Sequence, residues 1–529
     1  MSKLFERLYY YKKPEYVPQE VRCDVFIYGA TPAGLMAAIE LKKRGFSVAI
    51  AEITAYAGGM TTSGLGATDL GVEQAIGGLA KTFYDKVAQY YKKPKQFRFE
   101  PHVAQQIFSQ WIEEYELSIY YKQYLKSVDK NDSKLQTVTM ECGRTYRAKI
   151  FLDCTYEGDL MAMSGVTYQV GREAAEQYKE IYNGVQFGTE HHKFECWVDP
   201  YKEQGNRESG LLFGIQECQE YETNGSADHR IQAYNFRVCL TTELANQVAF
   251  FKPPSYDASH YELLLRYIEQ GYWDSLKLNT PLPNNKTDLN NFGGFSTDFI
   301  GMNHQFPHAS FEERQQIYEQ HVNYVMGLLY FLSHDNRLPA YVREDTLKFG
   351  LAKDEFQETY HFPPQLYIRE CCRMISEVIM TEQHAVKRKK VEDSIGIASF
   401  HMDSHHVRRI VLNGRVVNEG DIQVAVPPFE ISYRAIIPFK QQCENLIVPV
   451  CLSASHIAYG SIRMEPIFMI LGQSAAVAAA IALQKGLAVQ DIDYLELQQQ
   501  LLAIEQILCL DETFLDNPIE RMKSTFGGM

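Results

Sequence analysis

The chain has 529 residues, which is enough for two or three domains that each bury a core. Apolar residues make up 45% and charged residues 22%, a balance that is typical of a globular protein and excludes a largely disordered one. Acidic residues outnumber basic ones by 66 to 52, so the formal charge of −14 gives no electrostatic reason to bind nucleic acid.

The N-terminal residues carry no apolar segment followed by a small-residue cleavage site, and we therefore expect a cytoplasmic protein. The 11 cysteines show no paired spacing, which argues against a disulfide framework and against a zinc site. We expect these thiols to be reduced and mostly buried.

The first predicted elements are a strand, a glycine turn and a helix. Apolar residues 25–28 lead into the turn Gly29–Gly34, and Gly45 ends the helix that follows. A helix N-terminus offers unpaired N–H groups and a positive dipole end to a pyrophosphate. A second strand over residues 46–51 delivers Glu52, where a ribose hydroxyl needs an acceptor.

This order predicts a dinucleotide-binding site, although Thr31 replaces the middle glycine of the G-x-G-x-x-G pattern. The alternative is an ordinary βαβ unit without a ligand. Residues 58–66 are rich in glycine and small hydroxyl side chains, so we expect a loop whose backbone approaches the ligand closely. Thr61 and Ser63 would donate hydrogen bonds to the ligand there. An enzyme that binds a nicotinamide dinucleotide rarely needs such a loop at this position.

Helical and β patterns alternate in the next hundred residues. We expect helices over residues 78–91 and 103–115, and strands over residues 118–121, 137–140 and 150–152. The last of these strands runs into Thr155–Asp159, which turns helical. This is a second place where backbone could touch the cofactor.

The middle of the chain differs in composition. From about Val170 to Ala425 it is rich in Tyr, Phe, His, Asn and Pro, and we interpret it as a separate cap domain. Residues 281–286 mark a loop within it. Beyond the cap, residues 466–483 form a long apolar stretch with many small residues, which fits a buried core helix better than a membrane span.

Several segments of this chain also resemble a known family, the FAD-dependent oxidoreductases related to fumarate-reductase-type flavoproteins. Members of this family are often labelled, misleadingly, as xanthan lyases. The likeness covers nearly the whole chain. It rests on Gly29–Gly34, Gly58–Met60, Phe151–Leu160, Ala233–Arg237, Leu366–Glu370, Leu452–His456, Gly460–Pro466 and Gly472–Ala476.

The resemblance implies an α/β fold in two parts: a Rossmann-like FAD-binding domain with a mostly parallel sheet, and an inserted α+β substrate (cap) domain with an antiparallel sheet. We expect the FAD-binding domain over residues 20–170 and 429–490, and the cap over residues 171–428. A C-terminal helical tail would occupy residues 491–529.

The resemblance also implies FAD as the cofactor. The pyrophosphate would lie on the first turn, the adenosine ribose at Glu52, the ribityl and flavin side on the second glycine loop, and the adenosine half on the segment after residue 152. The residues carried over are Gly29, Thr31, Pro32, Ala33, Gly34, Glu52, Gly58, Gly59, Met60, Thr61, Ser63, Gly64, Thr155, Gly158 and Asp159.

The C-terminal block departs from many FAD enzymes, which place a Gly-Asp pair before the last helix. Here residues 448–453 stand in its place, and either backbone or Ser453 would substitute for the Asp that contacts the ribityl chain. A helix N-terminus or an arginine near the flavin would stabilise the charge of its reduced form. The last helix begins near Glu465, close to Arg463, or near Gly472, beside Gln473 and Ser474. The alternative role for Arg463 is a structural ion pair.

Hydride transfer to a flavin from an alcohol or amine needs a base, and histidine is suited to that task near neutral pH. His405 lies in a polar loop and His456 lies just before the Arg463 block, so both are candidates, with a structural role as the alternative. Asp403 could orient either. The group His401, Asp403, His405 and His406 does not fix a coordination sphere, and we expect no metal.

Arg369 and Arg373 are four residues apart, so on a helix they would share a face. Paired guanidinium groups clamp a carboxylate, as in fumarate-reductase-like enzymes. Ion pairs with Glu370 and Glu377 are the equally weighted alternative.

The leading hypothesis is an FAD-dependent oxidoreductase that transfers a hydride between flavin and a polar small molecule, either a sugar-like alcohol or a carboxylic acid. One alternative is a flavin ene-reductase fed by a partner electron donor, and another is a carbohydrate-binding or polysaccharide lyase-type protein. The re-oxidant would be O2 or an electron-transfer partner. We expect no membrane or nucleic-acid partner.

Overall fold

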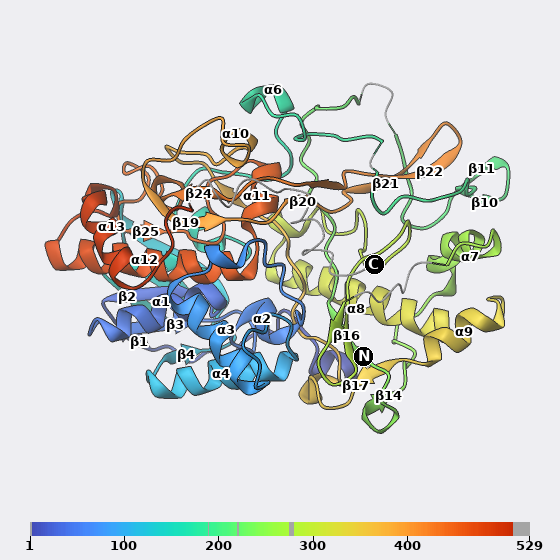
Figure 1. The fold of residues 1–529 in the computed structure, drawn as a ribbon, viewed down its shortest axis with the longest axis horizontal. Coiled ribbons are helices and arrows are strands. Elements are labelled where there is room, and N and C mark those ends of the chain that lie inside the picture. Colours follow the sequence, from blue (N-terminus) through green and yellow to red (C-terminus); the bar gives the residue numbers. More distant parts are fainter. Residues whose placement is uncertain (1–2, 189, 219–221, 274–279, 511–529) are drawn as a thin grey trace.

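The computed structural model describes residues 3–188, 190–218, 222–273 and 280–510 and is shown in Figure 1. The N-terminal part of the chain, in blue and cyan, and the C-terminal helices, in red, share one half of the molecule. The green and yellow middle of the chain builds the other half. Segments far apart in the sequence therefore complete the first half together.

A five-stranded parallel sheet forms the centre of the first half. Its strand order is β25 (Leu446–Ile447), β8 (Ile150–Asp153), β2 (Val25–Tyr28), β3 (Val48–Ala51) and β4 (Ser118–Tyr120). All residues of β2 and β8 are buried, because a parallel sheet is covered on both faces. This sheet confirms the predicted Rossmann-like α/β fold.

Two helices pack closely beside this sheet. Helix α1 (Pro32–Lys43) follows β2, and α12 (Glu465–Lys485) packs against α1. The helices meet at Ala33 and Gly472, where a Cβ on Gly472 would overlap the carbonyl oxygen of Ala33. Because α12 begins at Glu465, the alternative start near Gly472 is wrong. Gly472 lies inside the helix and allows the two backbones to touch.

Helix α12 is long and apolar enough to cross a membrane by composition alone, with a mean hydropathy of 1.9 over its most apolar window. However, 94% of that window is buried inside the protein. Packing in the core accounts for the apolar character of the helix, as the sequence predicts.

The other helices of this half are α2 (Gly59–Ser63), α3 (Gly78–Tyr90), α4 (Pro101–Glu114), α5 (Asp159–Met163), α11 (His456–Ile462) and α13 (Tyr494–Ala503). A smaller sheet has the order β1 (Glu20–Arg22), β7 (Thr145–Arg147), β6 (Lys134–Met140) and β5 (Leu125–Asn131). Helices α3 and α4 match the predicted helices to within two residues. Helix α13 lies in the predicted tail, of which residues 511–529 are outside the described residues.

The second half contains an antiparallel sheet. Its order is β14 (Gln247–Val248), β17 (Gly350–Ala352), β13 (Val238–Thr241), β16 (Lys286–Leu289) and β15 (Pro281–Leu282). Its helices are α7 (Glu262–Glu269), α8 (Phe311–His334) and α9 (Ala340–Leu347).

The loop predicted over residues 281–286 is instead a β-hairpin. Strands β15 and β16 pair antiparallel, and Asn284 and Asn285 form the turn with φ of +58° each. Asparagine tolerates this left-handed conformation, and a proline is accepted at the start of an edge strand. The sequence therefore predicted the turn correctly but did not predict strands β15 and β16 on either side of it.

The remaining strands form short sheets in both halves of the molecule. The paired strands are β9 (Tyr168–Gln169) with β18 (Arg373–Met374), β10 (Tyr201–Glu203) with β11 (Asn206–Leu211), β19 (Ser394–Ala398) with β24 (Phe429–Ser432), β20 (Met402–Ser404) with β23 (Ile422–Val424), and β12 (Gln216–Glu217) with β21 (Arg408–Leu412) and β22 (Arg415–Glu419). Helices α6 (Ala175–Tyr178) and α10 (Glu382–Ala385) are single turns. All 11 cysteines lie in the described part of the chain and are free thiols.

The contact between α1 and α12 can be tested at Gly472. Alanine has a helix propensity about 1 kcal/mol better than glycine, but its Cβ would overlap backbone that cannot move aside, at a cost of about 1–3 kcal/mol. We therefore expect Gly472→Ala to lower the free energy of unfolding, measured by urea denaturation.

Gln484→Ala is the matched control, since Gln484 is exposed on the same helix. We expect it to be neutral within about 0.5 kcal/mol. A Gly472→Ala variant more stable than the wild type would show that the two helices do not touch at this point.

Candidate functional site

The glycine turn holds the start of α1 against the next strand of the sheet. Gly29 has a φ of +98°, and a Cβ there would lie 2.8 Å from the carbonyl carbon of Cys154. Thr31 caps the helix, since its Oγ1 accepts from the N–H of Gly34 at 3.4 Å and donates to the carbonyl of Cys154 at 2.7 Å. Pro32 is the first helical residue.

This turn leaves a donor for a ligand. The N–H of Ala33 has no hydrogen-bond partner among the described residues. A Cβ on Gly34 would overlap the carbonyl oxygen of Gly29, so only glycine lets the chain fold back this tightly. An unused N–H at a positive helix end fits a pyrophosphate.

Glu52 supports the turn from the end of β3. Its Oε2 accepts from the N–H of Ala30 at 2.6 Å, and its Oε1 accepts from both the N–H and the hydroxyl of Thr54 at 2.7 Å. Burial raises the pKa of Glu52. Because each carboxylate oxygen can accept more than one hydrogen bond, the predicted ribose contact stays compatible with these bonds.

The segment after β8 is held largely by its own side chains. Asp153 accepts from Thr155 Oγ1 at 2.6 Å and from the N–H of Met161 at 2.8 Å, and burial raises its pKa to about 6. Gly158, with a φ of +76°, donates its N–H to Thr155 Oγ1. Thr155 and Gly158 therefore shape the loop, and their predicted contact with adenosine stays a prediction.

Asp159 has a partner that the sequence did not suggest. Both of its carboxylate oxygens pair with Arg314 on α8, at 2.5 and 2.8 Å. Next to it, Glu157 accepts from the hydroxyl of Tyr10 at 2.8 Å, and burial raises the pKa of Glu157 to about 8. Asp159 thus links the first half of the molecule to a helix of the second.

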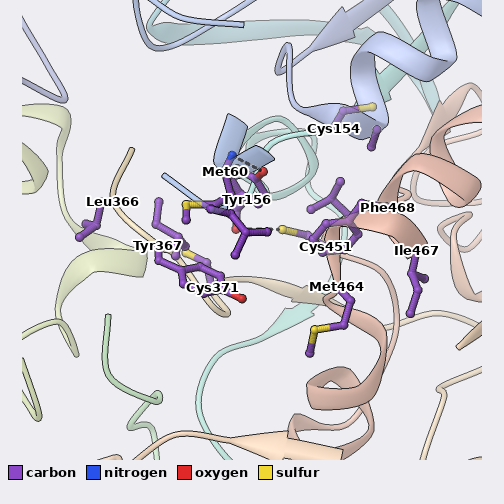
Figure 2. Packing of buried hydrophobic residues seen from close by; sticks show 14 of the residues in the cluster. Met60, Cys154, Tyr156, Leu366, Tyr367, Cys371, Cys451, Met464, Ile467 and Phe468 are labelled. Atoms are coloured by element: carbon purple, nitrogen blue, oxygen red, sulfur yellow. Dashed lines mark hydrogen bonds between the residues drawn. The ribbon is translucent and has the colours of Figure 1, made fainter. Parts of the chain in front are cut away.

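The second glycine loop folds into the single turn of α2. Gly58 and Gly59 have φ values of +97° and +49°, and a Cβ on Gly59 would overlap the hydroxyl of Tyr156. That hydroxyl accepts from the N–H of Met60 at 3.1 Å, as Figure 2 shows. Gly64 ends the turn. Ser63 lies within it, with its hydroxyl 3.2 Å from that of Thr62.

Glu465, the first residue of α12, joins this loop to the C-terminal block. One of its oxygens accepts from Thr61 at 2.9 Å and the other from Tyr156 at 2.8 Å. Burial raises the pKa of Glu465 to about 7. In Figure 2, Met464 and Phe468 flank the same region. The structure thus brings together the second glycine loop and the Arg463 block.

The three remaining cofactor candidates are engaged with the protein. Ser453 Oγ accepts from the N–H of Ser376 at 3.1 Å. Gln473 bonds Glu40 at 3.0 Å and the N–H of Leu79 at 2.8 Å, and Ser474 donates to Ile395 at 2.8 Å. The polar side-chain atoms of Gln473 and Ser474 therefore connect α12 to the elements packed around it.

The two candidate histidines lie beside strand β20: His405 follows its last residue, and His456 contacts Ser404 on the strand. His405 Nδ1 is 2.7 Å from Asp298 Oδ2, and its Nε2 is 3.5 Å from Asp403 Oδ2, too far for a hydrogen bond of normal strength. His456 Nδ1 is 2.7 Å from Glu370 Oε2, and its Nε2 is 3.0 Å from Ser404 Oγ. Both nitrogens of His456 thus have hydrogen-bond partners, whereas His405 lies between two carboxylates, with Asp298 close to Nδ1 and Asp403 more distant from Nε2.

The expected helix carrying Arg369 and Arg373 is wrong. The backbone N–H of Tyr367 bonds the carbonyl of Asn235 at 2.9 Å, and Arg373 begins strand β18. Tertiary pairing of the backbone overrides the helical spacing. The two guanidinium groups consequently have different surroundings.

Arg373 is held by structural partners: Glu173 at 2.7 Å, the carbonyl of Ala454 at 2.8 Å and the carbonyl of Gly171. Arg369 is fully buried, and its Nη2 lies 2.9 Å from Asp298 Oδ1 without alignment for a hydrogen bond. Burial lowers the pKa of Arg369. Of the two, only Arg369 shares a carboxylate with His405.

Arg463 joins the same cluster from the end of α11. Its Nη2 is 2.6 Å from Asp403 Oδ2, and its Nη1 donates to the hydroxyl of Tyr367 at 3.0 Å. The guanidinium of Arg369 lies 4.8 Å from the centre of the Tyr367 ring. The predicted alternative of a structural ion pair for Arg463 does occur, with Asp403 and not with Glu465, which bonds Thr61 and Tyr156.

Sequence reasoning missed three members of this cluster. Asp298 lowers the cost of burying both Arg369 and His405, and their charges hold its own pKa low despite burial. Arg237 pairs with Asp288 through two bonds of 2.8 Å. Arg237 and Tyr367 lie in segments that the family resemblance named, but no local pattern singled out Asp298.

One group of possible metal ligands does converge elsewhere: Glu100, His102, Asp354 and Glu355. The ammonium group of Lys286 lies among them, at 2.7 Å from Glu100, 2.8 Å from Asp354 and 2.7 Å from Glu355. A buried lysine thus supplies the cation that balances these carboxylates.

Several solved flavoprotein structures are similar to parts of the chain. The flavin-dependent brominase Bmp2 is 16% identical over 28% of this chain and 42% of its own, with a TM-score of 0.23. Thioredoxin reductase from T. acidophilum is 22% identical over 30% and 40%, with a TM-score of 0.18. A flavoprotein/dehydrogenase from Cytophaga hutchinsonii is 15% identical over 28% and 42%, with a TM-score of 0.21.

The chain thus spans about two fifths of the length of each of these structures. Likenesses this low carry no argument about activity. No curated protein matches the sequence.

A family model matches nearly the whole chain, including the glycine turn, the histidines and the arginine cluster. It describes an FAD dependent oxidoreductase and covers residues 24–501. The chain therefore belongs to the family of FAD-dependent oxidoreductases, and FAD is its cofactor.

Proposed function

We propose that this enzyme transfers a hydride between its flavin and a polar small molecule that carries a carboxylate. The observation that carries this proposal is a group of three buried guanidinium groups, those of Arg237, Arg369 and Arg463. Each retains at least one nitrogen without a hydrogen-bond partner among the described residues: Nη1 of Arg237, Nε and Nη2 of Arg369, and Nε of Arg463. Buried arginine N–H groups left unpaired are costly, and a carboxylate would satisfy them.

The surrounding acids balance the charge of the three arginines, so the unpaired N–H groups, and not a net positive charge, are what favour a carboxylate. Asp288, Asp298 and Asp403 each pair with one of the three arginines. Burial raises the pKa of two further acids near the cluster, Asp69 and Asp421. A raised pKa makes both acids easier to protonate than free carboxyl groups, which reduces their repulsion of an anionic ligand.

His405 is the proposed proton-transfer residue. Asp298 holds its Nδ1, and its Nε2, which lies 3.5 Å from Asp403 Oδ2, would take the proton of a substrate hydroxyl. When bound, the flavin supplies a two-electron acceptor for the hydride. The C–H bond then gives up its hydrogen and electron pair while the O–H proton moves to His405 and a C=O bond forms. O2 or an electron-transfer protein would act as the final oxidant.

The same arrangement suits the reverse direction. An unsaturated acid would be held by the same arginines, and His405 Nε2 would then deliver a proton to it. That reading makes the enzyme an ene-reductase fed by a partner electron donor. The guanidinium cluster favours an acid in both cases over a sugar-like alcohol.

We propose that FAD binds with its pyrophosphate at the N-terminus of α1, where the N–H of Ala33 is unused. The α2 loop would lie against its ribityl and flavin side. Residues 171–428 would form the substrate domain. The glycine contacts at positions 29, 34 and 59 support this placement, since each leaves no room for a side chain.

Gly34→Asp tests the cofactor site. The new side chain would bring a negative charge to the proposed pyrophosphate position and would overlap the carbonyl of Gly29. We expect a colourless purified protein, measured by its visible absorption. Gly45→Asp, at the open opposite end of α1, is the control and should stay yellow.

A yellow Gly34→Asp protein would refute the site. Circular dichroism should confirm that both variants are folded. Polysaccharide cleavage by the folded, flavin-free protein would support the lyase alternative in place of hydride transfer.

The two histidines are separated by His405→Gln and His456→Gln. We expect His405→Gln to keep its flavin and to reduce kcat by about 10²–10⁴-fold, the typical contribution of a general base. His456→Gln should lower the melting temperature and change kcat by less than about tenfold, because His456 connects Glu370 and Ser404. Anaerobic bleaching of the flavin by hydroxy acids and polyols measures both. The opposite order of effects would make His456 the base.

Substrate class is tested by Arg369→Lys and Arg463→Lys. A lost charge-assisted hydrogen bond is worth about 1.5–3 kcal/mol, so carboxylate substrates should bind roughly 10–150-fold more weakly. Arg434→Lys is the control, since Arg434 lies half-exposed and pairs with Glu377 and Asp393. A polyol that reduces wild-type and variant flavin equally well would exclude the carboxylate.

A further inference from the structure

Gln232 lies in a segment without regular secondary structure and contacts the proposed proton-transfer residue directly. Strand β20 ends at Ser404, so its pairing with β23 leaves the backbone N–H of His405 outside the ladder. The side chain of Gln232 satisfies this group, since its Oε1 accepts from the N–H of His405 at 3.1 Å. The side chain is buried. Gln232 therefore belongs to the proposed reaction centre by a contact with His405 itself.

The backbone of the same segment is anchored to the arginine side of the centre. The N–H of Gln232 donates to Glu370 Oε1 at 3.2 Å. The carbonyl of the next residue, Ala233, accepts from Arg369 Nη1. Two consecutive residues thus hold His405 and Arg369 in a fixed relation to each other.

These contacts also decide which end of the amide is unpaired. A backbone N–H can only donate, so the atom that faces the N–H of His405 must be the amide oxygen. The two N–H donors of Nε2 then have no acceptor among the described residues. Nε and Nη2 of Arg369 are unpaired in the same way. Buried donors without acceptors cost free energy, and an oxygen atom of a ligand would remove that cost.

We propose that Gln232 binds the substrate directly: Nε2 donates a hydrogen bond to the carboxylate that Arg369 binds, while Oε1 holds His405 in place. This inference rests on the proposed function, since it places Gln232 at the same substrate. Gln232 contributes specificity, because one side chain joins the group that binds the acid to the residue that exchanges the proton. Its amide neither gains nor loses a proton during turnover.

Two variants of similar length separate the two ends of the amide. Gln232→Met removes both, whereas Gln232→Glu keeps an oxygen for the N–H of His405 and removes only the donors. Gln506→Met is the matched control, since Gln506 is also buried, donates one amide hydrogen bond, to Gln473 at 2.8 Å, and has an unpaired Oε1. Succinate and myo-inositol probe the two substrate classes. The change in the flavin absorption spectrum of each FAD-loaded enzyme gives their dissociation constants.

We expect succinate to bind both Gln232 variants at least about tenfold more weakly than the wild type, because both lack the donor. Gln506→Met should bind succinate as the wild type does. Wild-type affinity in Gln232→Glu would overturn the proposal, since this variant keeps the bond to His405 and lacks only the donor. If the wild type binds only myo-inositol, the proposed carboxylate is wrong, and the affinity of Gln232→Met for that probe then decides whether Gln232 binds the substrate.

A second measurement does not depend on the substrate. Hydrogen–deuterium exchange of the FAD-loaded enzyme, resolved to single amides by mass spectrometry, reports the hydrogen bond of the His405 N–H. We expect this amide to exchange at least about tenfold faster in Gln232→Met than in the wild type, and to stay protected in Gln232→Glu. Equal protection in Gln232→Met and the wild type would overturn the proposal, because Oε1 would then not hold His405.

Discussion

The contact between α1 and α12 at Ala33 and Gly472 is the constraint on which the rest of the structure depends. It fixes the glycine turn from behind, because the crossing lies at the second residue of α1. The same helix places Glu465 on α2 through Thr61 and Tyr156. Arg463 lies two residues earlier and reaches Asp403. One close helix contact thus aligns the cofactor turn with the reaction centre.

The reaction centre is an arrangement of buried charges. Burying an arginine or an aspartate costs free energy unless a group of opposite charge lies beside it. Where such an ion pair keeps an unpaired N–H group, the pair does not fully offset the desolvation cost of that group. Here Asp298 serves both Arg369 and His405, and Asp403 serves Arg463. The N–H groups that remain unpaired are those at which we propose that the substrate binds.

The local parts of this fold could be predicted from the sequence. The strand, turn, helix and acid from residue 25 to Glu52 follow short-range rules of periodicity, capping and glycine conformation, and all form as expected. The prediction for Arg369 and Arg373 failed, because a spacing of four residues has meaning only on a helix. Their segment instead pairs its backbone with Asn235 and Gln169, which are distant in the sequence.

By itself, the sequence determined the dinucleotide turn, the long core helix and the family, since each depends on neighbouring residues or on motifs in order. It named His405 and His456 as equal candidates and could not rank them. The proposed ranking depends on the tertiary structure, which places Glu370 and Ser404 on His456 and Asp298 on His405. Those partners are 52 to 107 positions away, and no local pattern records which charges a folded chain brings into contact.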